Sequence, residues 1–130
     1  MGKIVAIGGG ENGRPGTAYE TGLFDAEIVR LAGKDDPNFL FIGLANSHAD
    51  SYYETMCAVF HDRLGCSHTD HLLEADLRDP DTLRQKIEWA DFIYVGGGKM
   101  LHCGDPIQYA DINTSYWQSH FYAFGRPPYN

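Results

Sequence analysis

The sequence predicts an α/β fold: a doubly wound, flavodoxin-like or Rossmann-like parallel sheet of about four strands, with flanking helices and an irregular C-terminal tail. Short apolar runs that end near glycine alternate with longer segments of helical periodicity, as in repeated β-α units. The apolar runs show no polar alternation, so their strands are expected to be buried on both faces of a parallel sheet. A chain of 130 residues supports one core of this kind and no second domain.

The first strand, the first helix and the second strand follow one another from the N-terminus. The run KIVAIGGG at 3–10 is strand-like and is closed by glycines. A helix is expected over 18–32, with Gly33 where a helix C-cap would stand. The run NFLFIGLAN at 38–46 predicts a second buried strand. The apolar residues at helical spacing in the first helix are Leu23, Phe24, Ile28, Leu31 and Ala32.

The next elements are a second helix and a more polar strand. The segment DSYYETMCAVFHDRLG predicts a helix that begins with Asp50 or Ser51 as its N-cap and ends at Gly65. The segment CSHTDHLLEAD at 66–76 is less apolar than the other strand candidates. Its composition favours a strand at the edge of the sheet.

A third helix and a fourth strand complete the predicted sheet. The helix over DPDTLRQKIEWAD starts near a proline, and Asp76, Asp79 and Asp81 are expected to cap it, because the helix dipole favours negative charge there. The run FIYVGGG at 92–98 returns to a buried strand. Strands and helices therefore alternate, which calls for parallel strands joined by right-handed crossovers with helices on both faces.

Residues 99–130 differ in composition from the rest of the chain. They hold 7 of the 17 aromatic residues and contain no valine and no glutamate, while Pro, His, Asn and Ser interrupt any period. We therefore divide the chain into an α/β domain at 1–98 and an aromatic-rich tail at 99–130 that packs on the domain or on a partner. A partly disordered end and a segment used for oligomer contact are the alternatives.

Charge and composition exclude several classes of partner. The formal net charge is −8 and the basic residues are scattered singly, so neither nucleic acid nor a membrane surface is an expected partner. The apolar stretch at 39–45 is far too short to span a membrane, and the N-terminus lacks the pattern of a secretory signal. Three cysteines without motif spacing, Cys57, Cys66 and Cys103, suit reduced thiols. A cytoplasmic protein is predicted.

Two glycine-rich turns are the main candidates for a binding site. If the strands take the order 3-2-1-4, the first and fourth strands are neighbours, and the turns IGGGENG and VGGGK meet at the switch point where such sheets bind ligands. Their backbone N–H groups would then face an anion, a carboxylate or a developing oxyanion. The alternative is that the glycines only permit tight turns. The candidate ligand-binding residues are Gly9, Gly10, Glu11, Gly96 and Lys99.

The first turn also satisfies the G-x-G-x-x-G pattern of dinucleotide sites, through Gly8, Gly10 and Gly13. Two features count against such a site. The segment Arg-Pro-Gly after Gly13 delays the helix, and the second strand ends in Ala-Asn where an acidic residue should meet the ribose. Dinucleotide binding is therefore the less favoured reading, and no cofactor is predicted.

Four segments, KIVAIGGGE, ETGLFDAEIVRLAGKDDPNFLFIGLANSHADSYYE, LGC and IEWADFIYVGGGK, together resemble the N-terminal half of the dipeptidase E and cyanophycinase-like serine peptidases. The resemblance covers about residues 3–98 and implies a fold akin to class I glutamine amidotransferases. It also implies hydrolysis of an amide bond near a peptide terminus, by a serine on a strained elbow, with the backbone of Gly97 and Gly98 holding the oxyanion. Glu11 matches the family's acidic residue after the first turn, and Lys99 replaces an asparagine.

The elbow and the catalytic histidine of that family fall beyond the matching region, and no catalytic residue is identified here. The adjacent pairs Ser119–His120 and His102–Cys103 do not replace them, because neighbours on an extended segment point to opposite sides. The chain is therefore predicted to be an inactive or incomplete peptidase, through truncation or a frame change after residue 98. The serines, none of which has glycine two residues before and two after, are Ser47, Ser51, Ser67, Ser115 and Ser119.

A non-catalytic module is the alternative to a peptidase. It would bind a small peptide or an anionic small molecule in the glycine crevice, or form a homo-oligomer through the tail or the exposed edge of the sheet. A metal site is not predicted, because the densest group of potential ligands lacks zinc-site spacing and is expected to be solvated. That group comprises His61, Cys66, His68, Asp70 and His71.

Overall fold

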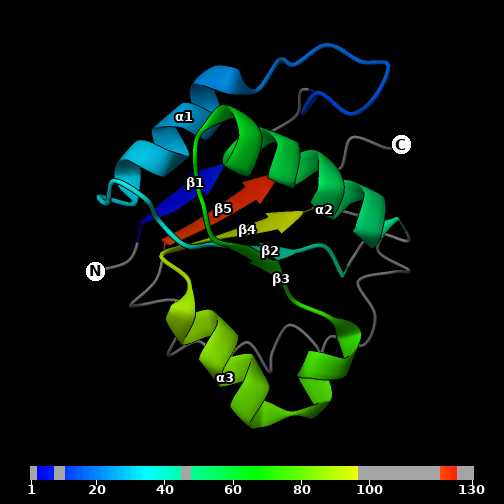
Figure 1. Cartoon of the computed structure of the whole chain (residues 1–130), viewed down its shortest axis with the longest axis vertical. Coiled ribbons are helices and arrows are strands. Elements are labelled where there is room, and N and C mark those ends of the chain that lie inside the picture. The colour runs from blue at the N-terminus through cyan, green and yellow to red at the C-terminus, as the bar shows by residue number, and fades with distance from the viewer. Residues whose placement is uncertain (1–2, 8–10, 45–47, 97–120, 126–130) are drawn as a thin grey trace.

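The computed structural model describes residues 3–7, 11–44, 48–96 and, for the backbone, 121–125 (Figure 1). In this part of the chain five parallel strands form one sheet in the order β1-β5-β4-β2-β3. The predicted α/β class with a parallel sheet is confirmed. The strands are β1 (Ile4–Ala6), β2 (Phe39–Ile42), β3 (Thr69–His71), β4 (Phe92–Gly96) and β5 (Phe121–Gly125).

Helices cover both faces of the sheet (Figure 1). Helices α1 and α2 lie on one face and α3 lies on the other. A π-helical segment, η1, continues α2, and a 3-10 segment, η2, precedes α3. Within the described ranges, no helix combines the length and the apolar character needed to cross a membrane. The helical elements are α1 (Gly22–Leu31), α2 (Ala49–Cys57), η1 (Ala58–Arg63), η2 (Glu74–Arg78) and α3 (Pro80–Trp89).

The two faces of β2 and β4 build two separate cores. Successive strand residues point to opposite faces, so Phe39 and Phe41 face α1 and α2 while Leu40 and Ile42 face α3. All four residues of β2 are buried, as expected for an inner strand of a parallel sheet. The core under α1 and α2 is aromatic, and that under α3 is aliphatic. The aromatic core includes Phe39, Phe41, Tyr52, Phe60, Phe92 and Tyr94.

The predicted order of strands is wrong. The first and fourth strands were expected to be neighbours, but β5 lies between β1 and β4, and β2 pairs with β4 and β3 instead of β1. Residues 121–125, expected to belong to an irregular tail, form this strand. The run FYAFG is rich in aromatic residues, which favour strands, and it ends in glycine as β4 does. The prediction that β3 lies at an edge is confirmed.

Local signals at helix ends were mostly correct. Gly33 and Gly65 take positive φ values of 73° and 79° after their helices, as expected for glycine terminators. The N-cap of α2 was wrong: His48 precedes the helix, and Asp50 lies inside its first turn. The first helix begins only at Gly22.

The predicted capping of α3 is confirmed for Asp79. Its carboxylate accepts from the N–H of Asp81 at 3.2 Å and from the hydroxyl of Thr82 at 2.8 Å. Asp76 does not cap α3. Asp76 is a residue of η2, and its carboxylate caps the start of that segment by accepting from the N–H of Leu73 at 2.8 Å. It also accepts from the ammonium group of Lys86 at 2.8 Å.

Replacing Asp79 with alanine is expected to lower the urea midpoint of unfolding, because the first turn of α3 loses its acceptor. The hydrogen bonds with Thr82 hold the pKa of Asp79 below its ordinary value. The stabilisation is therefore present above the pKa of an unfolded aspartate and is lost as pH falls through the folded-state pKa. Urea titrations at neutral and acid pH measure this, and Asp79→Ser, which keeps an acceptor, should restore most of the neutral-pH midpoint. An equal loss in both variants would contradict the capping role.

Candidate functional site

The carboxyl ends of β1 and β4 lie at the same edge of the sheet. Ala6 and Val95 both pair with Phe124, so the two strands end level with each other. Since β5 separates them, their ends are about 10 Å apart, which is two strand spacings. The strands that precede the two glycine turns therefore end on the same side of the sheet, but they are not adjacent as the sequence predicted (Figure 1).

Of the predicted binding residues, the structure describes Glu11 and Gly96. The others, Gly9, Gly10 and Lys99, lie outside the described residues, as do the oxyanion candidates Gly97 and Gly98. Their roles stay predictions.

Glu11 is engaged within its own loop. Its carboxylate accepts from the Nε of Arg14 at 3.1 Å and from the Nη2 of the same guanidinium at 3.4 Å. Both side chains are 30% exposed, so this is a partly screened pair at the surface of the loop. Glu11 and Arg14 thus balance each other's charge within the loop.

The chain from 11 to 21, here called the first loop, is a compact hairpin. Asn12 and Tyr19 form an antiparallel bridge, and the N–H of Glu20 donates to the carbonyl of Glu11 at 2.8 Å. Gly13 and Gly16 take positive φ values of 78° and 85°, which permit the turn. The loop therefore has a defined backbone and does not lead directly into a helix. This geometry confirms that the Arg-Pro-Gly segment after Gly13 delays the start of the helix.

Gly96 ends β4 against helix α2. A Cβ atom at this position would lie 2.8 Å from Cε2 of Tyr52 and 3.0 Å from Cζ of Phe41. Such distances are shorter than van der Waals contact, so a side chain here would displace one of the two rings. The glycine is therefore required by close packing against Tyr52 and Phe41.

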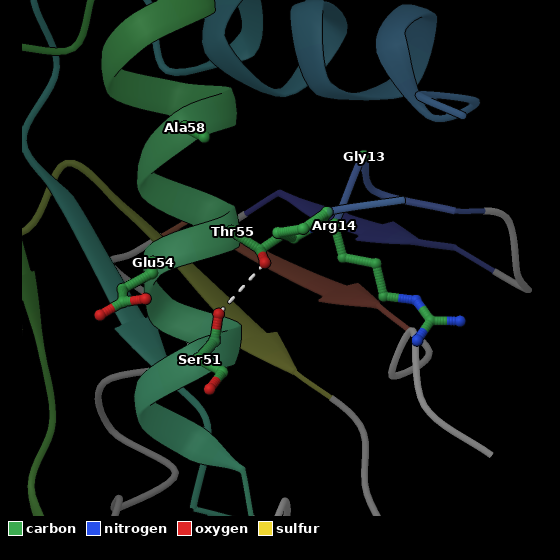
Figure 2. A pocket seen from close by; sticks show the side chains of 7 residues that line it. Gly13, Arg14, Ser51, Glu54, Thr55 and Ala58 are labelled. Carbon is green, nitrogen blue, oxygen red and sulfur yellow. Dashed lines mark hydrogen bonds between the residues drawn. The ribbon is translucent and has the colours of Figure 1, made fainter. Parts of the chain in front are cut away.

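A cavity of about 450 Å³ lies between the first loop and α2 (Figure 2). The Thr55 hydroxyl donates to the Ser51 carbonyl at 3.1 Å along its wall, and the side chains of Arg14 and Glu54 extend away from each other. Sequence reasoning did not find this cavity, because its two walls are far apart in the chain. The lining residues are Gly13, Arg14, Pro15, Ser51, Glu54, Thr55 and Ala58.

A buried polar cluster, absent from the sequence prediction, anchors the first loop to α1. The Thr21 hydroxyl lies 3.1 Å from Oδ1 of Asn12 and 2.7 Å from Oδ2 of Asp25, and the Tyr19 hydroxyl lies 2.9 Å from the same Asp25 oxygen. Burial raises the pKa of Asp25 above its ordinary value, although the hydrogen bonds with Thr21 and Tyr19 act in the opposite direction. Arg63 of η1 stacks over the Tyr19 ring at 4.3 Å.

One sequence signal could have revealed this cluster. Asp25 stands among the apolar residues of the first helix, which the sequence analysis placed at helical spacing. In the structure Leu23 and Phe24 are 88% and 54% exposed, whereas Asp25 is fully buried. An acid on the buried side of a short helix is unusual and points to a special environment.

In the described part of the chain, no serine hydroxyl or cysteine thiol pairs with a histidine. Burial and the nearby Asp36 raise the pKa of the Cys66 thiol to about 11, which keeps it protonated and unreactive. Cys57 contacts Thr69, while His61 and His68 contact Asp62 and Asp36 respectively.

The group considered as metal ligands is dispersed. His71 stacks on the Tyr53 ring at 4.0 Å, and Asp70 lies 3.6 Å from the ammonium group of Lys86. Among the described residues, no three carboxylate, imidazole or thiol groups are placed to hold a metal ion together.

Comparison with known proteins gives two findings. The model of peptidase family S51 matches residues 4–108, which extends the predicted resemblance by ten residues beyond the second glycine turn. The bifunctional muramidase/DL-endopeptidase CwlT of Bacillus subtilis (strain 168) is 49% identical over 35 residues. That match covers 26% of this chain and 11% of the relative, so the chain corresponds to only a small part of that protein.

Proposed function

Because the chain belongs to peptidase family S51, we propose that it is a peptidase-related domain that binds a small peptide or anionic molecule and does not hydrolyse it unaided. The observation that carries this proposal is the cavity between the first loop and α2, at the edge of the sheet where β1 and β4 end. Ligands of open parallel sheets bind outside the carboxyl ends of the strands. The cavity has the position and the size of such a site.

The lining favours a peptide-like ligand. The walls offer a hydroxyl on Ser51 and a carboxylate on Glu54, and the Arg14 side chain that also lines them is paired with Glu11, so they supply both hydrogen-bond donors and acceptors. A peptide presents an amine, amides and a carboxylate, which match these groups. The 35-residue likeness to a protein named as an endopeptidase agrees with a peptide as the ligand class.

The absence of hydrolysis rests on the sequence of these 130 residues. None of its serines has the glycine neighbours of a nucleophile elbow, and Ser51 belongs to a helix, where its side chain has no histidine partner among the described residues.

The second candidate function is S51 hydrolysis itself, favoured by the length of the family match. It would proceed by acyl transfer with the oxyanion at Gly97 and Gly98.

Incubation with N-terminal aspartyl dipeptides separates the two functions. We expect a saturable rise in the melting temperature with dipeptide, because a ligand that binds only the folded state stabilises it, and no release of free amino acid. Release that increases in proportion to the protein, and that disappears when one serine is changed, would support hydrolysis instead.

A cavity-filling variant tests the location of the site. Ala58→Phe places a ring in the cavity and should abolish the dipeptide-dependent shift in melting temperature. Ala26→Phe is the matched control, because Ala26 is exposed on α1 and away from the cavity lining. An equal response in both variants would place the ligand elsewhere.

A further inference from the structure

The first loop is attached to the helical layer through one buried carboxyl group. Asp25 is 0% exposed, and its Oδ2 atom contacts the hydroxyls of Thr21 and Tyr19 at 2.7 and 2.9 Å. Thr21 in turn contacts Oδ1 of Asn12, which is 2% exposed. These contacts tie the beginning and the end of the loop to α1.

The hydrogen bonds among the three side-chain oxygens of Asn12, Thr21 and Asp25 indicate the protonation state of Asp25. Asn12 Oδ1, Thr21 Oγ1 and Asp25 Oδ2 lie in sequence at 3.1 and 2.7 Å, and each contact between two oxygens needs one hydrogen. The Thr21 hydroxyl supplies only one. A carboxylic acid at Asp25 supplies the second, so that Asp25 donates to Thr21 and Thr21 donates to the Asn12 carbonyl oxygen.

The surroundings of Asp25 also disfavour a carboxylate. The titratable groups that face it are the phenols of Tyr19 from the first loop and Tyr94 from β4, and Tyr94 in turn interacts with Tyr52 of α2. Burial raises the pKa of both Tyr19 and Tyr94, so these phenols are neutral. The nearby cation, Arg63, lies over the ring of Tyr19, and none of the described contacts brings it to the carboxyl group.

We propose that Asp25 is a positioning residue that holds the first loop as a neutral carboxylic acid, and that its ionisation loosens the loop. Charging Asp25 removes the proton that links it to Thr21 and leaves a buried carboxylate. Its Oδ1 atom has no hydrogen-bond partner in the described structure, and the Nδ2 atom of Asn12, which also has none, makes no hydrogen bond to it, so no donor is in place to stabilise the charge at Oδ1. The loop lines the cavity through Gly13 and Arg14, but the inference holds whether or not the cavity binds a ligand.

One other arrangement would satisfy the same contacts. If the oxygen and nitrogen of the Asn12 amide were exchanged, the amide would donate to Thr21 and Thr21 would donate to an ionised Asp25. The two arrangements predict opposite effects of Asp25→Asn. If Asp25 is a neutral acid, the asparagine amide donates to Thr21 in its place and the hydrogen bond is kept. If Asp25 is ionised, the substitution removes the carboxylate that accepts from Thr21.

Asp25→Asn is therefore the decisive variant. Its melting temperature at neutral pH should equal or exceed that of the wild type, and the infrared absorption of a protonated carboxyl group should disappear from the spectrum. Since the folded-state pKa of Asp25 is raised, its contribution to stability is fully present below the pKa of unfolded aspartic acid. This contribution is lost as pH rises through the folded-state pKa. The melting temperature of the wild type should therefore rise relative to that of Asp25→Asn as pH falls.

Glu27→Gln is the matched control, because it removes an acid from an exposed position of the same helix. Its hydrogen bond with Arg30 lowers the pKa of Glu27, so its contribution to stability should change with pH in the opposite direction.

Thr21→Val supplies a second test. The backbone amides of residues 12–20 should exchange faster with solvent in this variant, while the infrared absorption of the protonated carboxyl group persists.

Three results would overturn the proposal. The first is a lower melting temperature of Asp25→Asn at neutral pH, with no change in the protonated-carboxyl absorption. The second is loop exchange in Thr21→Val at the wild-type rate. The third is a melting temperature of the wild type that does not rise relative to that of Asp25→Asn as pH falls.

Discussion

Replacing Phe39 with alanine is expected to reduce the free energy of unfolding by about 3–5 kcal/mol, the range for removal of a fully buried aromatic ring. Phe39 is 0% exposed, and its ring centroid lies 4.7 Å from that of Phe60 and 5.2 Å from that of Phe92. The ring thus joins β2, β4 and η1 in the core under α1 and α2. Its loss leaves a cavity that these rigid elements fill only in part.

Urea titration followed by circular dichroism measures this effect. Phe24→Ala is the matched control, because it makes the same chemical change on a ring that is 54% exposed. The control should lose much less stability than Phe39→Ala. Similar losses in the two variants would mean that the aromatic cluster does not carry the stability of the sheet.

Replacing Gly96 with alanine is expected to destabilise the fold by about 1–3 kcal/mol, the usual cost of overpacking a core. The added methyl group would lie 2.8 Å from Cε2 of Tyr52 and 3.0 Å from Cζ of Phe41. Either ring must move, and the Tyr52 ring is held at the start of α2, next to Ser51 of the cavity lining. The substitution should therefore also weaken any dipeptide-dependent shift in melting temperature.

A double-mutant cycle with Tyr52→Ala isolates the collision. Removing the Tyr52 ring makes room for the new methyl group, so the cost of Gly96→Ala should be smaller in the Tyr52→Ala background. The coupling energy is obtained from the four free energies of unfolding. Its sign should show that the double variant is more stable than the sum of the two single costs predicts. Additive costs would show that the effect of Gly96→Ala arises from the backbone or from Phe41.

Most features encoded by neighbouring residues were predicted correctly, although the N-cap of α2 and the start of α1 were not. The cap at Asp79 and the terminators at Gly33 and Gly65 depend on hydrogen bonds and backbone angles within a few residues. The family resemblance was also recoverable, since it rests on the glycine turns and their order along the chain. It is confirmed by the family match over residues 4–108.

Features that depend on distant pairing were not predicted. The position of β5 between β1 and β4 follows from contacts between residues more than 20 positions apart, and no local pattern encodes that choice. The cavity has the same origin, because the first loop and α2 meet only after β1 and β2 enter the same sheet. The buried cluster around Asp25 was missed because its members, from Asn12 to Asp25, come together only when the first loop folds back against α1.

By itself, the sequence determined the α/β class, the approximate places of β1 to β4 and of the three α-helices, and the family, because periodicity and turn chemistry act over short distances along the chain. Only the tertiary structure decided which strands are neighbours, which side of α1 is buried and where the chain leaves a cavity. Those outcomes depend on which apolar surfaces come together and on how buried polar groups find hydrogen-bond partners, and both are properties of the packed molecule as a whole.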